Sequence, residues 1–451
     1  PPPPSPTRYN AGKLPFAGAQ IGLGFRNEIS PKGGLLRVRE FCMAEIEHFC
    51  DPNDKSYAAF KNVRDTKLVF FSAENQLSTG KTFEMAIGEA VDSKLVDNET
   101  LGYFLARTQQ FMIKIGMDPT RLRFRQHLRT EMAHYATDCW DLEIKVSSGW
   151  IECVGHADRS AYDLTVHAAK TKTDLYAVKI LDKPLKVDIA KLKFDRKTMG
   201  MVFKADQRKV ANALEAVAES WADWEKLVAE FEASGKVTVD GYEVAKEMVT
   251  WEKKTKTVHE TKFTPSVIEP SFGIGRVLYS LLEHSFGVRE KDEQRTVLHF
   301  KPWIAPTKVA VLPLSKKPEF ETVNKFTLDE CLRLNLSNRL DDSGASLGRR
   351  YARADELGMP FCITLDFQTL IDNTATLRER DSMLQIRAPL PEILQLCRKM
   401  CDGDDYTFDM AGKKYGYVTV AEEEGEVADE KKGKTFVEST ARGRFSRPSD
   451  M

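Results

Sequence analysis

Charged side chains and one phenylalanine alternate in residues 25–49, the stretch with the clearest chemistry. Its sequence, FRNEISPKGGLLRVREFCMAEIEHF, predicts a strand, a tight turn at residues 31–34 and a second strand. Every second residue of a strand shares a face, so Arg37, Arg39 and Phe41 should lie together. Arginines can bind phosphate and an aromatic ring can stack on a base, so this face suits a nucleotide. A solvated charged face is the alternative.

A second pattern occupies residues 266–284, with the sequence SVIEPSFGIGRVLYSLLEH. It predicts a strand that ends at Ile268, a turn at Pro270 and a helix that begins near Arg276. The two glycines of this stretch let the backbone approach a neighbour closely. A Gly-x-Gly-Arg string alone is weak evidence, because many turns between a strand and a helix carry glycines.

The two stretches, in this order, resemble motif 2 and motif 3 of the class II aminoacyl-tRNA synthetases, and the longer strings are similar to the eukaryotic-type glycyl-tRNA synthetases. Motif 2 would span residues 25–49 and motif 3 residues 269–284. The resemblance implies an α+β fold, with an antiparallel catalytic sheet flanked by helices. It also implies ATP as a substrate, with Mg²⁺.

The resemblance assigns roles to residues of this chain. It implies that Arg26 and Arg276 are catalytic. The implied ATP-binding residues are Arg26, Asn27, Glu28, Arg37, Val38, Phe41, Glu152, Cys153 and Arg276. The implied glycine-binding residues are Glu45, Glu269, Pro270 and Ser271.

Glu152 stands out because residues 150–154 predict a mostly buried strand. A carboxylate in such a strand is unfavourable unless it is paired or bound to a cation. Glu152 is therefore the Mg²⁺ ligand that we expect. Residues 121–127 alternate arginine with apolar side chains, and acids on the same sheet explain them better than phosphate does.

Changes in composition, charge and hydrophobic periodicity divide the chain into successive segments. They are a flexible lead-in at residues 1–10, a catalytic domain at 11–305 with an insertion at about 186–262, an α/β anticodon-binding domain with a mixed sheet at 306–400, and a charged, largely disordered tail at 401–451. The insertion predicts one helix at residues 210–231, a stop at Gly235 and a hairpin at 237–244.

The anticodon-binding domain is expected because residues 341–353 and 376–382 resemble the domain that several class II synthetases share. Clustered arginines there are candidate tRNA contacts, and internal ion pairs are an equal alternative. These arginines are Arg349, Arg350, Arg353, Arg378 and Arg380.

Composition excludes several classes of protein. Lys plus Arg number 66 against 67 Asp plus Glu, so any nucleic-acid binding must use local basic patches. The eight cysteines form no Cys-x-x-Cys pair, which argues against a structural zinc site. No apolar run approaches the roughly 18 residues of a membrane helix. Scattered cysteines favour the reducing cytoplasm, with the mitochondrion as a second compartment.

The resemblance implies a homodimeric glycine–tRNA ligase that joins glycine to ATP and then transfers it to the 3′ end of tRNA(Gly). In that family a motif 1 and an Arg-Pro-Glu-Thr-Ala-Gln-Gly string precede motif 2. Nothing in residues 1–24 matches either one, so we expect a chain that lacks motif 1. A truncated or paralogous tRNA-binding protein without catalysis is therefore the alternative.

Overall fold

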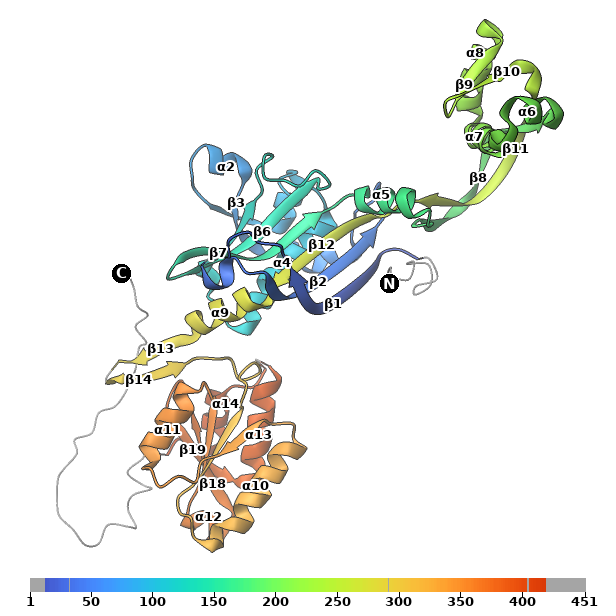
Figure 1. Cartoon of the computed structure of the whole chain (residues 1–451). Coiled ribbons are helices and arrows are strands. Elements are labelled where there is room, and N and C mark those ends of the chain that lie inside the picture. Colours follow the sequence, from blue (N-terminus) through green and yellow to red (C-terminus); the bar gives the residue numbers. More distant parts are fainter. Residues whose placement is uncertain (1–12, 32, 291, 404, 419–451) are drawn as a thin grey trace, which may run out of the picture. The chain divides into compact units, whose positions relative to one another are not determined.

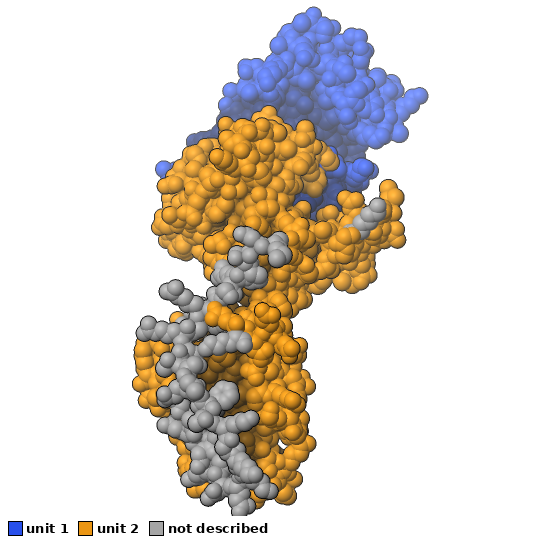
Figure 2. All heavy atoms as spheres, turned by 90° about the vertical axis from the view of Figure 1, so that its left-hand side faces the viewer, with its two compact units in different colours: residues 1–18, 47–55, 159–268 blue, residues 19–46, 56–158, 269–451 orange. Residues whose placement is uncertain are grey.

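The computed structural model describes residues 13–31, 33–290, 292–403 and 405–418. The lead-in predicted at residues 1–10 lies outside this part of the chain. Among the described residues, no helix combines the length and hydropathy needed to cross a lipid bilayer. The chain divides into two compact units, which Figure 2 colours separately. Unit 1 contains residues 1–18, 47–55 and 159–268, and unit 2 contains residues 19–46, 56–158 and 269–451.

An eight-stranded sheet, most of whose residues belong to unit 2, has the strand order β1-β2-β12-β7-β6-β5-β3-β4 (Figure 1). The pairs β3–β4, β5–β6 and β6–β7 are antiparallel, and β3–β5 is parallel. The expected antiparallel-rich sheet is thus confirmed. The strands are β1 Phe16–Phe25, β2 Glu40–Cys50, β3 Lys67–Phe71, β4 Phe83–Ala86, β5 Leu122–Gln126, β6 Asp138–Val146, β7 Gly149–Asp158 and β12 Ser266–Gly273.

Helices cover this sheet. α4 (Glu99–Ile115) begins at Asn98, whose side chain accepts a hydrogen bond from Leu101 N, and ends at Gly116, whose φ is 106°. α9 (Ile274–Ser285) packs against β6 and β7. Phe70 and Trp140 belong to the core of the sheet: both are fully buried, and their ring centroids lie 5.3 Å apart. The shorter elements are η1 Gly34–Leu36, η2 Ala58–Asn62, α2 Ala73–Leu77, α3 Ile87–Asp92 and η3 Pro119–Arg121.

A long antiparallel ribbon of β8 (Ala177–Phe194) and β11 (Val249–Phe263) dominates unit 1. Two helices replace the single predicted one, because the chain breaks at Ser220, whose hydroxyl caps the second helix. The predicted stop at Gly235, with φ 72°, and the predicted hairpin are confirmed. The elements are α5 Tyr162–Thr171, α6 Arg196–Phe203, η4 Lys204–Asp206, α7 Gln207–Ala218, α8 Trp221–Ser234, β9 Lys236–Val239, β10 Tyr242–Ala245 and η5 Lys246–Met248.

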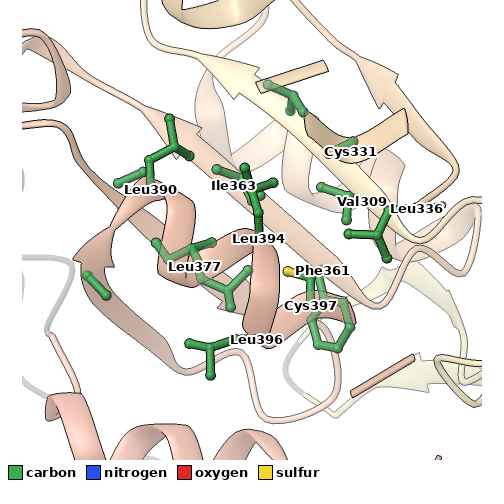
Figure 3. Close-up of a cluster of buried hydrophobic side chains, with 14 of the residues drawn as sticks. Val309, Cys331, Leu336, Phe361, Ile363, Leu377, Leu390, Leu394, Leu396 and Cys397 are labelled. Carbon is green, nitrogen blue, oxygen red and sulfur yellow. The ribbon is translucent and has the colours of Figure 1, made fainter. Parts of the chain in front are cut away.

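The C-terminal part of unit 2 holds a five-stranded sheet in the order β16-β15-β17-β18-β19. The first three strands are parallel and the last two pairings are antiparallel, so the predicted mixed sheet is confirmed. Apolar side chains of the sheet and its helices form the core shown in Figure 3. The elements are β15 Val309–Pro313, η6 Pro318–Phe320, α10 Glu321–Arg333, β16 Asn338–Leu340, α11 Leu347–Glu356, β17 Phe361–Leu365, α12 Phe367–Asp372, β18 Thr374–Glu379 and β19 Gln385–Pro389.

Two helices occupy the beginning of the predicted tail. α13 (Leu390–Asp402) continues past Cys401, and α14 (Phe408–Tyr415) buries Ala411 completely in the core of the C-terminal sheet. The prediction of a structureless tail from residue 401 is therefore wrong as far as residue 418. Residues 419–451, to which the rest of that prediction applies, lie outside the described part. A short hairpin of β13 (Phe286–Arg289) and β14 (Asp292–Leu298) precedes the C-terminal sheet.

Candidate active site

The hairpin predicted around residues 31–34 has a wider loop than expected. β1 ends at Phe25 and β2 begins at Glu40, and Arg26 N donates to Arg39 O at 2.9 Å to close the loop. Gly33 and Gly34 have φ values of 71° and 59°, which favour glycine, and lead into η1. The turn chemistry was recognised from the sequence, but the strand boundaries were misplaced.

Arg26 and Phe41 lie together where the hairpin strands end. The guanidinium carbon of Arg26 is 5.7 Å from the centroid of the Phe41 ring. A Cβ atom on Gly24 would lie 2.8 Å from Phe41 Cε2 and 2.5 Å from Met43 Sδ. The ring therefore keeps its place because residue 24 has no side chain, a role that sequence inspection missed.

The loop is ordered by its own charged groups. Arg39 Nε donates to Glu28 O at 2.9 Å, and Arg37 Nε lies 3.9 Å from Glu28 Oε2. Asn27 is exposed and Val38 is half-buried. The loop residues named from the resemblance thus stand in one connected segment, with polar groups open to a ligand.

The expected glycine-binding residues come from two neighbouring strands, β2 and β12. Ser271 Oγ donates to Glu45 Oε1 at 3.4 Å. Glu269 precedes Ser271 by two positions on β12, so both side chains lie on one face. Pro270 is buried between them on the other face, inside the strand. The predicted turn at Pro270 is therefore wrong, since β12 continues to Gly273.

Glu152 is not buried, contrary to the sequence prediction, because its side chain is 54 % exposed. A register shift between β6 and β7 places it directly opposite Glu143 and leaves Cys153 as an extra residue. Loss of water against the sheet, followed by the nearby Asp141 carboxylate, raises the pKa of Glu152. Its carboxylate tip remains open to a ligand.

Cys153 turns away from Glu152. Its side chain is 3 % exposed, and its Sγ lies 3.7 Å from Ser280 Oγ of α9. Burial raises the pKa of this thiol to about 11. Cys153 therefore offers only its backbone to the face that carries Glu152.

Arg276 ties three elements together. Its guanidinium donates to Leu36 O at 2.7 Å, to Glu152 O at 2.7 Å and to Leu35 O at 3.3 Å. A guanidinium has five N–H groups, so these bonds leave about two for a ligand. The base of α9 is close to β7, since a Cβ on Gly273 would lie 3.3 Å from Cys153 O. Arg276 thus joins η1, β7 and α9 around the proposed site.

Magnesium is implied by the resemblance, and the carboxylate of Glu152 suits it. Within the described residues, no group of three His, Cys, Asp or Glu side chains could hold a metal ion. Mg²⁺ is commonly bound by one or two carboxylates together with substrate phosphates, rather than by a cage of protein ligands. The half-exposed oxygen donor Glu152 fits that arrangement, so the ion would arrive with ATP.

Three of the five arginines expected to contact tRNA are buried, so that prediction is wrong for them. Arg378 is 5 % exposed and binds both carboxylate oxygens of Asp355, at 2.8 and 3.0 Å. Arg350 donates to Pro313 O at 2.7 Å, and Arg380 donates to Phe300 O at 2.7 Å. Internal partners, the alternative weighed from the sequence, explain these three residues.

The other two arginines remain available at the surface. Arg349 is exposed, and Arg353 is 47 % exposed with Nη1 3.1 Å from Asp341 Oδ2. The arginines of residues 121–127 also have the internal partners that we expected. Arg123 lies 2.6 Å from Glu143, and Arg125 lies 3.0 Å from Asp141.

Comparisons with known proteins identify the family of this chain. A family model for the tRNA synthetase class II core domain (G, H, P, S and T) matches residues 7–285, and one for the anticodon binding domain matches residues 308–400. A glycine–tRNA ligase of Caenorhabditis elegans is 50 % identical over 409 residues, which cover 90 % of this chain and 55 % of that protein. A glycine–tRNA ligase of Methanothrix thermoacetophila is 43 % identical over 400 residues, covering 88 % of this chain and 68 % of the relative.

A crystal structure of prolyl-tRNA synthetase from Cryptosporidium parvum is also similar, with a TM-score of 0.42 and 10 % identity over 86 % of this chain and 58 % of that one. The chain spans little more than half the length of several curated relatives. Membership is decided by the core-domain match and by the sequence identity. The chain belongs to the class II aminoacyl-tRNA synthetases, within the family of the glycine–tRNA ligases.

Proposed function

We propose that the protein is a glycine–tRNA ligase, which activates glycine with ATP and transfers it to the 3′ end of tRNA(Gly). The observation that carries the proposal is the pairing of Ser271 with Glu45 at 3.4 Å, on strands adjacent to the Arg26 loop and to β7. The Glu45 carboxylate and the Ser271 hydroxyl can accept hydrogen bonds from the ammonium group of a small amino acid. The guanidinium groups of Arg26 and Arg276 can bind the phosphates of ATP.

In the first step, a carboxylate oxygen of glycine attacks the α-phosphorus of ATP. The new P–O bond replaces the bond to the bridging oxygen, and pyrophosphate leaves with that electron pair. In the second step, a hydroxyl oxygen of the terminal adenosine attacks the glycyl carbonyl carbon. The C–O bond to the phosphate breaks, AMP leaves with that electron pair, and the hydroxyl proton passes to AMP or to water. No covalent bond to the protein is needed, so catalysis rests on positioning and on charge stabilisation.

ATP would be held by residues that converge from β2, β7 and α9. Phe41 would stack on adenine, and Arg26 would bind the α-phosphate. Arg276, with the N–H groups that its carbonyl partners leave, would bind the outer phosphates. The remaining contacts would come from Asn27, Glu28, Arg37, Val38, Glu152 and the backbone of Cys153. Mg²⁺, bound by Glu152 and the phosphates, would neutralise charge that develops on the leaving pyrophosphate.

Glycine would be recognised through its ammonium group, since it offers no side chain. Glu45 and Glu269 would accept its N–H groups, and Ser271 would fix the orientation of Glu45. A larger amino acid would have to place its side chain on the face of β12 that carries Glu269 and Ser271. Pro270, buried on the opposite face, restricts movement of the strand away from it.

The partners follow from the same proposal. Exposed Arg349 and Arg353 are the remaining candidate contacts to tRNA in the anticodon-binding domain. A homodimer is supported by exposed apolar side chains on one face of β1, where Ile21 is 75 %, Leu23 58 % and Phe25 70 % exposed. We place the protein in the cytoplasm, with the mitochondrion as a second compartment because a yeast relative is named as mitochondrial.

The decisive experiment is glycine-dependent exchange of pyrophosphate into ATP by the purified 451-residue chain. The proposal is supported if exchange requires glycine and if alanine cannot take the place of glycine. Absence of exchange above background, together with retained binding of tRNA(Gly), would reject catalysis and leave a tRNA-binding protein.

A further inference from the structure

A row of charged side chains crosses β5, β6 and β7 next to the proposed ATP site. Arg123 pairs with Glu143 across β5 and β6, and Glu143 pairs with Glu152 across β6 and β7. In the neighbouring position, Arg125 pairs with Asp141. Residues directly opposite in antiparallel strands share a face, so these five side chains, the charged row, lie on the face of Glu152.

Arg125 is the centre of the charged row. Its Nη1 lies 2.9 Å from Glu131, its Nη2 3.0 Å from Asp141 and its Nε 3.3 Å from Glu143. Each side of the guanidinium thus holds a different carboxylate. The side chain of Asp141 is 5 % exposed and that of Glu143 is 12 % exposed, so water screens their charges weakly.

Glu152 differs from these two carboxylates. Its side chain is 54 % exposed and its Oε1 lies 3.9 Å from Arg276 Nη1, beyond hydrogen-bond distance. It can therefore turn toward a ligand. Asp141 is held by Arg125 and His127, and Glu143 is held by Arg123 and Arg125. The charged row thus contains one carboxylate that can change orientation, Glu152, and two that are held in place, Asp141 and Glu143.

We propose that Arg125 is a positioning residue for the magnesium–nucleotide complex. It neutralises and immobilises Asp141 and Glu143, so that Glu152 alone among the three turns to the cation that ATP carries. This inference rests on the proposed function.

The physical reason is local charge. Without Arg125, Glu143 would keep its contact with Arg123 and Asp141 its contact with His127. The carboxylate charge that these contacts leave unbalanced would repel the triphosphate and would compete with Glu152 for the cation. One uncompensated charge in a weakly screened position changes an equilibrium constant by roughly tenfold or more.

The same contacts would be present if Arg125 only stabilised the fold. The test must therefore distinguish the effect of the lost charge on Mg–ATP binding from a loss of folded structure. Arg125→Gln should raise the Kd for Mg–ATP about tenfold in calorimetric titrations of the full chain. The charge-balanced double variant Arg125→Gln/Asp141→Asn should return the Kd to within about twofold of the wild type. A double variant as weak as the single one would overturn the proposal.

A matched control is Arg378→Gln, which removes a buried arginine from Asp355 in the C-terminal part of unit 2. Its Kd for Mg–ATP should stay unchanged, and weakening equal to that of Arg125→Gln would show a general structural effect and overturn the proposal. If circular dichroism shows that Arg125→Gln does not fold, Arg125→Lys replaces it. That variant keeps the positive charge beside Asp141 and Glu143, so its Kd for Mg–ATP should stay within about threefold of the wild type; a loss of tenfold in folded protein would overturn the proposal.

The wild-type chain separates this inference from the proposed function. If it fails to bind Mg–ATP, the proposed function falls and the inference falls with it. If it binds Mg–ATP and exchanges pyrophosphate, while Arg125→Gln binds with the same Kd, only the role of Arg125 is rejected.

Discussion

Arg26 is exposed at the end of β1, next to the Phe41 ring, and its replacement should affect chemistry more than folding. We expect Arg26→Ala to lower kcat/KM for pyrophosphate exchange at least about a hundredfold, because a cation over the α-phosphate acts mainly in the transition state. Steady-state exchange kinetics would measure this. Arg129→Ala, at another exposed arginine of unit 2, is the control. Unchanged exchange in Arg26→Ala would mean that the loop is only a charged surface.

Glu45 should determine the affinity for glycine and leave the affinity for ATP unchanged. Glu45→Gln keeps an oxygen that can accept from Ser271 but removes the charge that would meet the ammonium group. The KM for glycine should rise about tenfold or more, since a hydrogen bond between charged groups is worth roughly 1.5–3 kcal/mol. The KM for ATP should stay constant. Equal rises in both constants would place Glu45 in the framework of the sheet instead of the glycine pocket.

Individual arginines show where inference from sequence stops. Residue types and order were enough to identify the hairpin, the helix after Gly273 and the class II family. They could not separate exposed Arg349 from Arg350, its neighbour, which is 4 % exposed and donates to Pro313 O. The partner carbonyl is distant in sequence, and only the folded sheet brings it to the guanidinium.

At the scale of elements, β1 should set the position of the Phe41 ring through Gly24. We expect Gly24→Ala to raise the KM for ATP about fivefold or more, because its Cβ would lie 2.8 Å from Phe41 Cε2 and would displace the ring. Gly18→Ala is the control on the same strand, since a Cβ there meets nothing within 4 Å. ATP titrations in the exchange assay compare the two variants. Equal KM values would show that the ring position does not govern ATP binding.

Glu152 was expected to be buried, and the bulge between β6 and β7 explains why it is exposed instead. Simple alternation along residues 150–154 predicts a buried strand, but one extra residue at Cys153 turns Glu152 to the open face. Hydrophobic pattern does not reveal such a shift, because Cys153 and Val154 are both buried. The same limit applies to the 26–39 loop, whose width depends on the Arg26–Arg39 hydrogen bond.

At the scale of the whole molecule, the parts have separate cores. The helices and hairpin of unit 1 pack around buried Trp224 and Phe231, and the C-terminal sheet of unit 2 has its own apolar cluster. Each of these parts therefore has its own hydrophobic pattern, and the domain bounds drawn from the sequence stay a prediction. The start of the predicted tail was misjudged because α14 is short and buries few residues, among them Phe408 and Ala411.

Stability of unit 2 should depend on pH through His156. Its ring is 1 % exposed, its Nδ1 donates to Trp140 O at 3.2 Å, and its Nε2 therefore accepts from Thr108 Oγ1 at 2.8 Å. Burial lowers the pKa of this imidazole from 6.5 to about 4. The unfolded chain thus binds the proton first, and the free energy of unfolding should fall as pH drops from about 6.5 to about 4, by up to about 3 kcal/mol.

Thermal unfolding across this pH range, monitored by circular dichroism, would test the sign and size of the effect. His156→Gln removes the titrating group, so its stability should depend less steeply on pH, whatever its stability at pH 7. His134→Gln, at an exposed histidine, is the matched control and should keep the wild-type slope. An unchanged slope in His156→Gln would mean that the folded protein accommodates the charged imidazole, and that the hydrogen bonds to Thr108 and Trp140 do not fix its neutral form.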